Sequence, residues 1–425
     1  MEHITTLKLF NKNFTLLILG QLISLLGNSL QRFALSLYIL DITGSAAIFS
    51  TVLALTIIPQ IVIAPFGGAI ADRFSKKKIM ITLDFFSSAL LLLFFILLRE
   101  SNQQILLIGI LTCTLAIIQN FYDPTVRATI PAITAKENLT KANSVVSQIS
   151  AITLLIGPIA AGFIYGLFGI YGVFVINIIS FFLSAIMELF LTIPFCKLPH
   201  VGNAMVTFTK DIMHTLTYLY KEKRIVLSFI IIAAGINLFL TPLYIVGVPY
   251  LEKVVFHVSD NLYGISEGCI GAGMIVGSTL VGIFSKVLSI HKVPKFFFLL
   301  SIIIMFMGIP TLGFLCRQEG SNYTSYILLT LFGILFALCI AIINIISISF
   351  IQLVTPQEKM GKIMALTIAL SSALLPIGSV LFGFLYEVFA GKLFILYIVA
   401  GIIALGTARF ISYLLKKEAS NLSTI

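Results

Sequence analysis

Residues 67–78 read GGAIADRFSKKK, a short polar and basic stretch between two long apolar runs. The run before it ends at about residue 71 and starts at 46, and the run after it covers 79–98. Each run is long enough to cross a bilayer as a helix, because a span needs about 20 residues. The four cations in the stretch predict that it faces the cytoplasm. We therefore interpret it as a turn between two membrane-spanning helices.

The composition extends this interpretation to the whole chain. Of its 425 residues, 59% are hydrophobic and 10% are charged, whereas a soluble domain carries about 25% charged residues. The first apolar run, 14–40, is too long for the apolar part of a signal peptide and predicts the first span. The five cysteines show no CxxC spacing, so we predict neither a disulfide nor a metal site. The sequence indicates an all-α membrane protein.

The apolar runs predict twelve spans. Their approximate ranges are 14–40, 46–71, 79–98, 104–122, 142–167, 171–193, 225–249, 263–287, 295–315, 324–354, 363–386 and 393–415. With both termini in the cytoplasm, 21 Lys and Arg fall on cytoplasmic segments and 4 fall outside. The acids divide 8 to 6, as expected when Lys and Arg alone set the orientation. The net charge of +10 is thus explained by topology, and we expect no nucleic-acid partner.

One connection divides the chain into two sets of six spans. We predict an N-terminal six-helix bundle over 1–193, a cytoplasmic linker over 194–224 and a C-terminal six-helix bundle over 225–425. Within the linker, 205–220 has apolar residues at helical spacing. This segment is either an amphipathic helix on the inner leaflet or a passive connection.

The two halves are related in sequence. A shift of 221 positions without gaps gives 12 identities between Ile130 and Phe168, Gly157/Gly378 and Gly162/Gly383 among them. In an apolar chain some identities arise by chance, but identities between glycines and between polar residues are less easily explained by composition. Two related six-span halves follow the parallel-repeat plan of major facilitator transporters. The sequence therefore predicts two six-helix bundles related by a pseudo-two-fold axis.

The 67–78 turn resembles the loop signature G-x-x-x-D-[RK]-x-G-[RK]-[RK] of the major facilitator superfamily. The matching residues are Gly68, Asp72, Arg73, Lys76 and Lys77, and Ser75 stands where the family has glycine. A carboxylate beside cations forms charge-assisted hydrogen bonds. The resemblance implies that this cluster, joined by Asp123 at the cytoplasmic end of span four, gates alternating access. The alternative is a topology signal alone.

Span five carries Gly157, Pro158 and Gly162, which resemble the G-P-x-x-G-G signature of the drug:proton antiporter branch. Proline removes a backbone hydrogen bond and bends a helix, and glycines let another helix pack closely. Across the chain, the diffuse pattern is similar to the macrolide-efflux type of that branch. That group often has Gly-Asp in span one, where this chain has Gly27-Asn28, so the coupling mechanism does not carry over directly.

Polar residues on the spans predicted to line the central cavity are candidate substrate contacts or helix–helix hydrogen bonds. They are Asn28, Arg32, Gln119, Asn120, Asn237, Tyr244 and Asn344. Charges inside a membrane are costly and usually have a function. We predict Glu267 and Asp84 as proton-coupling candidates. The alternatives are that Arg32 and Glu267 reach the outer interface, that Asp84 pairs with the nearby lysines or Arg73, and that Glu188 is interfacial.

The resemblance implies a proton-coupled exporter of an amphiphilic, macrolide-type compound in the plasma membrane. Its expected partners are protons, the small substrate and the lipid bilayer, and we expect a monomer without cofactors. The alternatives are a siderophore exporter or a lysophospholipid transporter of the same fold. A polytopic lipid-modifying enzyme is the alternative from a different class, but the five histidines lie outside the spans and form no acid–base or metal cluster.

Overall fold

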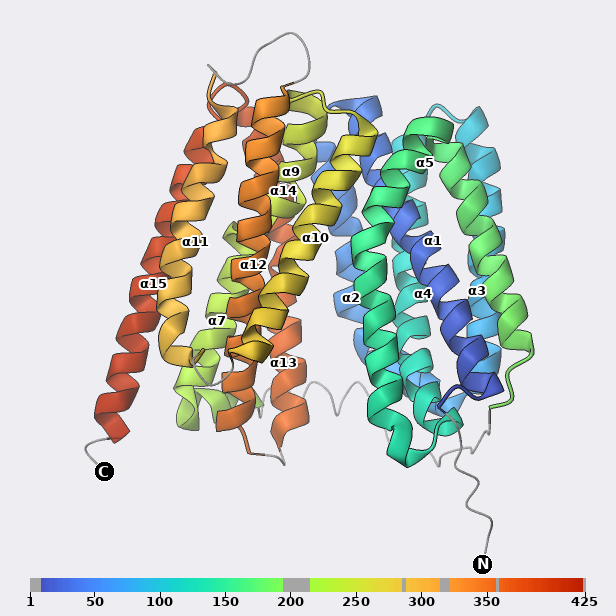
Figure 1. Cartoon of the computed structure of the whole chain (residues 1–425), viewed down its shortest axis with the longest axis horizontal. Helices are drawn as coiled ribbons and strands as arrows, with labels where there is room; N and C mark the ends of the chain where they lie inside the picture. Colours follow the sequence, from blue (N-terminus) through green and yellow to red (C-terminus); the bar gives the residue numbers. More distant parts are fainter. Residues whose placement is uncertain (1–8, 194–214, 285–287, 314–321, 357–358, 423–425) are drawn as a thin grey trace, which may run out of the picture. The chain divides into compact units, whose positions relative to one another are not determined.

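The computed structural model describes residues 9–193, 215–284, 288–313, 322–356 and 359–422. Every regular element in these ranges is a helix (Figure 1). A bilayer offers the backbone no water to bond, so helices that satisfy their own backbone groups are expected. Ten helices of the described ranges are long and apolar enough to cross a membrane, and Ala46–Ile61 is a shorter apolar helix. The all-α membrane fold is confirmed, and the number twelve stays a prediction.

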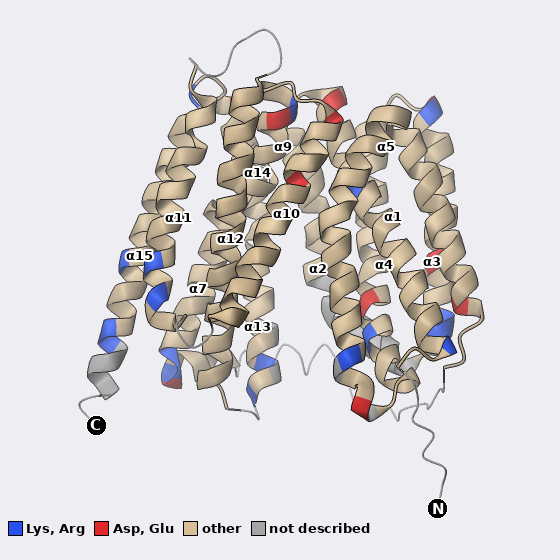
Figure 2. Cartoon of the chain, in the orientation of Figure 1, with Lys and Arg blue, Asp and Glu red and all other residues tan. Residues whose placement is uncertain are grey.

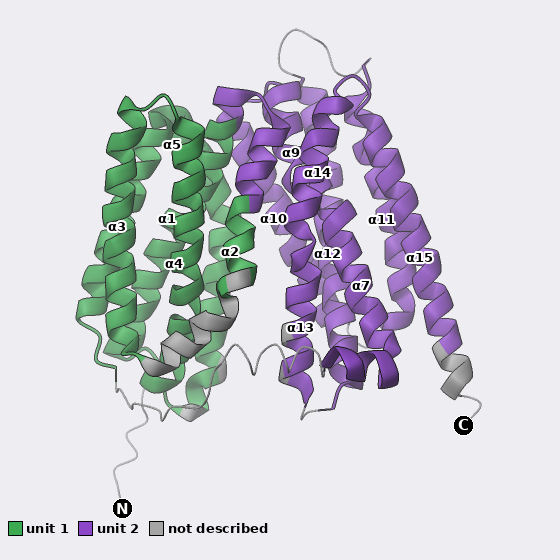
Figure 3. Cartoon of the chain, turned by 180° about the vertical axis from the view of Figure 1, so that it is seen from behind, with its two compact units in different colours: residues 1–39, 55–201 green, residues 40–54, 202–425 purple. Residues whose placement is uncertain are grey.

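The chain divides into two compact units (Figure 3). Unit 1 comprises Met1–Ile39 and Leu55–Val201, and unit 2 comprises Leu40–Ala54 and Gly202–Ile425. The short stretch 40–54 thus packs with the C-terminal helices, although it precedes most of unit 1 in sequence. The linker prediction over 205–220 falls mainly outside the described residues, of which 215–222 are helical.

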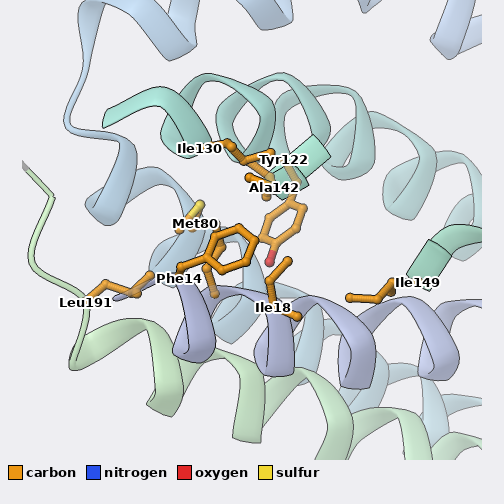
Figure 4. Close-up of a cluster of buried hydrophobic side chains, with 10 residues drawn as sticks. Phe14, Ile18, Met80, Tyr122, Ile130, Ala142, Ile149 and Leu191 are labelled. Carbon is orange, nitrogen blue, oxygen red and sulfur yellow. The ribbon is translucent and has the colours of Figure 1, made fainter. Parts of the chain in front are cut away.

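Unit 1 is built mainly from the first helices of the chain. These are α1 (Lys12–Thr43), α2 (Ala46–Arg73), α3 (Lys76–Glu100), α4 (Gln104–Ile133) and α5 (Leu139–Leu189). Helix α3 packs against both α4 and α5. Ten buried side chains form an apolar cluster at one end of α1, with Phe14, Met80 and Tyr122 at its centre (Figure 4). This cluster joins α1, α3, α4 and the first leg of α5.

Helix α5 contains an abrupt break at Gly169. This glycine has φ +62° and ψ −167°, a left-handed backbone that glycine adopts without a Cβ clash. The chain turns there, so the 51 residues of α5 form two helical legs. The break falls between the predicted spans 142–167 and 171–193 and confirms their separation.

Unit 2 contains the remaining helices. They are α7 (Arg224–Phe239), α8 (Thr241–Ile245), α9 (Gly247–Tyr250), the π-helical turn η2 (Leu251–Val255), α10 (Asp260–Ile283), α11 (Val293–Met307), α12 (Tyr323–Val354), α13 (Met360–Ala373), α14 (Leu375–Val388) and α15 (Phe394–Leu422). Helix α10 packs against α12, α11 against α15, and α7 against α13 and α14.

The stretch 40–54 is attached to unit 2 by hydrogen bonds at the start of α2. The carboxylate of Glu387, on α14, accepts hydrogen bonds from the backbone N–H of Ala47 (3.1 Å) and from the hydroxyl of Ser45. A carboxylate is stabilising at a helix N-terminus, where unpaired N–H groups and the helix dipole favour negative charge. Glu387 therefore caps the start of α2, although the two segments lie about 340 residues apart in the sequence.

The helix boundaries repeat at the offset found in the sequence. Helix α4 ends at Ile133 and α12 ends at Val354, which are related by the same shift of 221 positions. Helix α5 begins at Leu139 and α13 begins at Met360, which are again related by that shift. The internal repeat thus extends from residue identities to the ends of the helices.

Candidate functional site

A track of polar side chains joins α1 and α4 of unit 1. The side-chain amide of Asn28, on α1, donates to Gln119 Oε1 on α4 at 3.1 Å, and Gln119 Nε2 donates to Asp123 Oδ1 at 2.5 Å. Arg32 lies one helical turn after Asn28 and interacts electrostatically with Asp123. Arg32 and Asp123 are both exposed. The track therefore presents one cation and one carboxylate, joined by amides, at the surface of unit 1.

The structure moves Asp123 away from the predicted helix end. Helix α4 does not stop at residue 122 but continues to Ile133, with Pro124 and Pro131 inside it. Proline is tolerated inside a membrane helix when neighbouring groups compensate for the lost hydrogen bond. Asp123 therefore lies well before the end of α4, and its described partners are the amide of Gln119 and the charges of Arg32 and Arg127.

Three other residues predicted to line the cavity, Asn120, Asn237 and Asn344, are not part of the polar track. Asn120 Nδ2 donates to the carbonyl of Ala116 in its own helix (2.8 Å). Asn237 Nδ2, on α7, donates to the carbonyl of Ser371 on α13 (2.9 Å), which is a helix–helix bond. Asn344 is exposed on α12.

In unit 2, two predicted residues are in direct contact. Tyr244, on α8, donates its hydroxyl to Glu267 Oε2 on α10 at 2.7 Å. Glu267 is half-buried. A carboxylate within a candidate span faces a partner or a cavity far more often than lipid. Glu267 and Tyr244 are therefore one site, built from two helices of the same unit.

A second acid beside this site was missed by the sequence analysis. The predicted span 225–249 ends before Glu252. In the structure the helical segment continues through η2 to Val255, and Glu252 is 0% exposed. Ser266, next to Glu267 on α10, donates its hydroxyl to Glu252 Oε1 at 2.6 Å. The two carboxylates are electrostatic neighbours. An acid followed by a lysine is typical of a loop, which is why the predicted span ends before Glu252.

Unit 1 also holds a pair of buried acids. Asp84 on α3 and Glu188 on α5 are each 1% exposed and interact electrostatically. Tyr122, whose ring lies in the apolar cluster of Figure 4, donates its hydroxyl to Glu188 Oε1 at 2.8 Å. The interfacial alternative for Glu188 is therefore wrong, because the end of α5 packs against α3 and buries it.

The alternative that Asp84 pairs with the lysines of the turn is also wrong for those lysines that the structure describes, since none of them forms a salt bridge with Asp84. The ammonium of Lys77 reaches the carbonyl of Leu189 instead, at 2.7 Å. Within the described ranges, both salt bridges involve Lys253, which contacts Asp41 and Asp260. The burial and side-chain contacts of Gly68, Asp72 and Arg73 lie outside what the structure describes. The predicted gating cluster of these residues with Lys76 and Lys77 therefore stays a prediction.

The span-five motif lies at a close helix contact. A Cβ on Gly157 would stand 2.0 Å from Ser29 Oγ of α1. The repeat-related Gly378 also approaches α7 closely, since its Cβ would lie 2.5 Å from the carbonyl oxygen of Leu238. Pro158 is inside α5, and Gly162 is buried. In both units this glycine lets the helix pack against the first helix of its half.

Comparison with protein families gives one match over most of the chain. The model described as Major Facilitator Superfamily matches residues 17–379. This chain belongs to the major facilitator superfamily. As a member of this family it is a multi-pass membrane transporter and not an enzyme. Its internal repeat and its two helical units accord with the fold of that superfamily.

The relatives and solved structures are distant. Macrolide efflux protein A of Streptococcus pyogenes is 24% identical over 382 residues, covering 85% of this chain and 86% of the relative. The staphyloferrin A transporter of Staphylococcus aureus is 25% identical over 365 residues, covering 86% and 87%. A bacterial homologue of the iron transporter ferroportin in an inward-facing state has a TM-score of 0.71 at 17% identity, covering 94% and 98%. A D-xylose–proton symporter has a TM-score of 0.68 at 14% identity, covering 95% and 97%.

In this transporter the charges are distributed unevenly along each unit. Figure 2 shows most lysines and arginines toward the end of unit 1 that carries the N-terminus and the end of unit 2 that carries the C-terminus. The acids of the polar track and of the Glu252–Glu267 pair lie within the helical regions. The arrangement can bind a polar or charged group and can hold protons, and it offers no nucleophile–base pair for covalent chemistry among these residues.

Proposed function

We propose that this major facilitator protein is a proton-coupled exporter of an amphiphilic, macrolide-like compound in the plasma membrane, with both termini in the cytoplasm. It works as a monomer by alternating access, and it needs no cofactor. The observation that carries the coupling is Glu267, a half-buried carboxylate held by the hydroxyl of Tyr244. A carboxylate within a membrane span that binds a proton in one state and loses it in the other links transport to the pH gradient.

The polar track of unit 1 supports an amphiphilic substrate. Most side chains of the spans are apolar, and the track adds a few fixed polar groups, as small-molecule sites usually do. The similarity to macrolide efflux protein A supports export of a compound of that class. Asp123 supplies a carboxylate for a cationic group of the substrate.

The test is a drug-sensitivity panel in a host that lacks its own efflux pumps. Cells that express the wild-type chain are expected to tolerate higher concentrations of macrolides and to accumulate less of them. The Glu267→Gln variant, made at equal membrane levels, is expected to lose this protection. Equal drug accumulation with and without the wild-type chain would contradict export of this class.

The second candidate is export of a siderophore or another anionic compound. It is favoured by Arg32, an exposed guanidinium on α1 beside Asn28, and by the similarity to the staphyloferrin A transporter. Arginine binds carboxylates in a fixed two-point geometry.

Charge variants of the polar track separate the two candidates. For an anionic substrate, Arg32→Gln is expected to reduce transport at least about tenfold, since a charged hydrogen bond contributes roughly 1.5–3 kcal/mol. For a cationic substrate, Asp123→Asn is expected to have the larger effect. Uptake of labelled substrates into inside-out vesicles measures both. An Arg32→Gln variant that exports a siderophore at the wild-type rate would exclude the second candidate.

A further inference from the structure

Glu252 and Glu267 are brought together by two elements of unit 2, the π-helical turn η2 and α10. Glu252 is 0% exposed, and its Oε2 atom has no hydrogen-bond partner. Its Oε1 atom accepts the hydroxyl of Ser266, which is also 3.0 Å from Thr330 Oγ1 on α12. Glu267 is half-buried and so is the more accessible of the two acids.

The groups around this pair are neutral or acidic. Tyr244 faces it from α8, Tyr263 from α10 and Tyr326 from α12. No cation is among the described groups that act on Glu252 or Glu267. The nearby ammonium of Lys253 is bound instead to Asp41 and Asp260.

Two carboxylates in such surroundings cannot both be ionised without a large cost. Burial of one ion costs several kcal/mol even after relaxation, and a like charge close by adds to this cost. The hydroxyl of Ser266 donates to Glu252, and the hydroxyl of Tyr244 donates to Glu267. These two hydrogen bonds do not offset two charges, and Glu252 Oε2 has no donor. The pair is therefore built to retain a proton.

We propose that Glu252 and Glu267 form a shared proton-binding site, and that its occupancy controls the Lys253 bridge between Asp41 and Asp260. The proposal deepens the proposed proton coupling and names Glu252 as its second carboxylate. A proton enters at Glu267 and is held between the two acids. Its arrival converts one carboxylate to a carboxylic acid, and its departure restores the charge.

The link to the ion pairs is structural. Glu252 and Lys253 are consecutive residues of η2, and Asp260 begins the helix that carries Ser266 and Glu267. Any change in the spacing of η2 and α10 must therefore move Lys253 relative to Asp260. π-Helical turns inside α-helices are frequent at functional sites.

Protonation gives this movement a direction. Repulsion between two ionised carboxylates pushes η2 and α10 apart, and a pair that holds a proton lets them approach. Lys253 then shifts toward Asp260 and away from Asp41, from which it lies 3.1 Å in this structure. Asp41 is in the last turn of α1, whose earlier residues belong to unit 1.

The shared site is tested by infrared titration of carboxyl groups in the purified full-length protein in lipid nanodiscs, without substrate. The spectrum of the double variant Glu252→Gln/Glu267→Gln is subtracted to remove the other acids. In the wild type we expect two separated proton-release steps, because coupled acids titrate as a pair. Each single variant is expected to show one step at a pH between the two.

Independent acids would give a different result, in which each single variant keeps one wild-type step at its original pH, and this would overturn the proposal. Glu222→Gln, an exposed glutamate of the same unit, is the matched control and is expected to keep both steps. If the glutamate variants do not fold, Ser266→Ala retains both acids. It is expected to move both steps, and a shift of one step alone would also overturn the shared site.

The link to Lys253 is tested by hydrogen–deuterium exchange at one pH. The double glutamine variant imitates the fully protonated pair, and Lys253→Met removes the bridge. Both are expected to speed exchange in residues 40–54 several-fold relative to the wild type. Unchanged exchange in the double variant would overturn the control of the bridge.

These measurements need no transport, so they separate the two proposals. Two coupled steps in a protein whose transport ignores the pH gradient would support the shared site and contradict the proposed function. Proton-driven transport by a protein whose two acids release their protons independently would support the proposed function and contradict the shared site.

Discussion

At the scale of single residues, the hydroxyl of Tyr244 adjusts how readily Glu267 gives up a proton. A hydrogen bond donated to a carboxylate stabilises its charged form, and bonds to charged groups contribute about 1.5–3 kcal/mol. The contact of 2.7 Å joins α8 to α10 inside unit 2. Its loss therefore changes proton release without removing the carboxylate itself.

The Tyr244→Phe variant tests this contact. Without the donor the charged form of Glu267 is less stable, so the proton is retained to higher pH. We expect the pH profile of transport to move toward alkaline pH by about one to two units, because one unit corresponds to about 1.36 kcal/mol. Tyr413→Phe, on an exposed tyrosine of α15, is the matched control. A Tyr244→Phe profile identical to that of the wild type would contradict a role of this hydroxyl.

At the scale of helices, glycines set how closely the elements of each unit approach. Gly157 packs against Ser29, and Gly378 packs against Leu238. The two contacts are related by the internal repeat and involve α5 with α1 and α14 with α7. The same device thus serves both units.

The Gly157→Ala variant is expected to destabilise the protein by about 1–3 kcal/mol, the usual cost of overpacking. The added methyl would stand 2.0 Å from Ser29 Oγ. Thermal unfolding in detergent should show a lower midpoint, and Ser29→Gly should restore part of it. Gly109→Ala is the control, because its methyl would meet Leu55 at an ordinary 3.7 Å. Equal midpoints for the two alanine variants would contradict the close contact.

Sequence patterns predict the elements of this protein better than its sites. Apolar runs and the internal repeat at an offset of 221 can be found in the sequence, and the helix ends follow the repeat. Glu252 was missed because an acid followed by a lysine is typical of a loop. The π-helical turn instead buries the acid and places the lysine beside Asp41 and Asp260. The Arg32–Asp123 approach and the Asp84–Glu188 pair depend on packing between distant segments, which no local pattern contains.

At the scale of the whole molecule, the proposed alternating access requires a cluster on the predicted cytoplasmic side that can form and release. The turn with Asp72 resembles the family signature except at Ser75, and Asp72 is the acid among its neighbouring cations. The Asp72→Asn variant is expected to insert normally and to transport at a small fraction of the wild-type rate. Vesicle transport at equal protein levels measures this, with Glu137→Gln, an exposed acid of the same unit, as the control. Transport by Asp72→Asn at the wild-type rate would contradict the gating role and favour the alternative that the turn is a topology signal alone.

In the proposed mechanism, a pH gradient drives export through the acid pair of unit 2. The deciding experiment uses purified protein in liposomes that hold a fluorescent amphiphilic substrate on one side and carry an imposed pH gradient. We expect substrate accumulation against its gradient that collapses when an ionophore dissipates the pH difference, and that is absent in the Glu252→Gln/Glu267→Gln variant. Accumulation that persists after the pH difference is dissipated, or that the double variant retains, would contradict it.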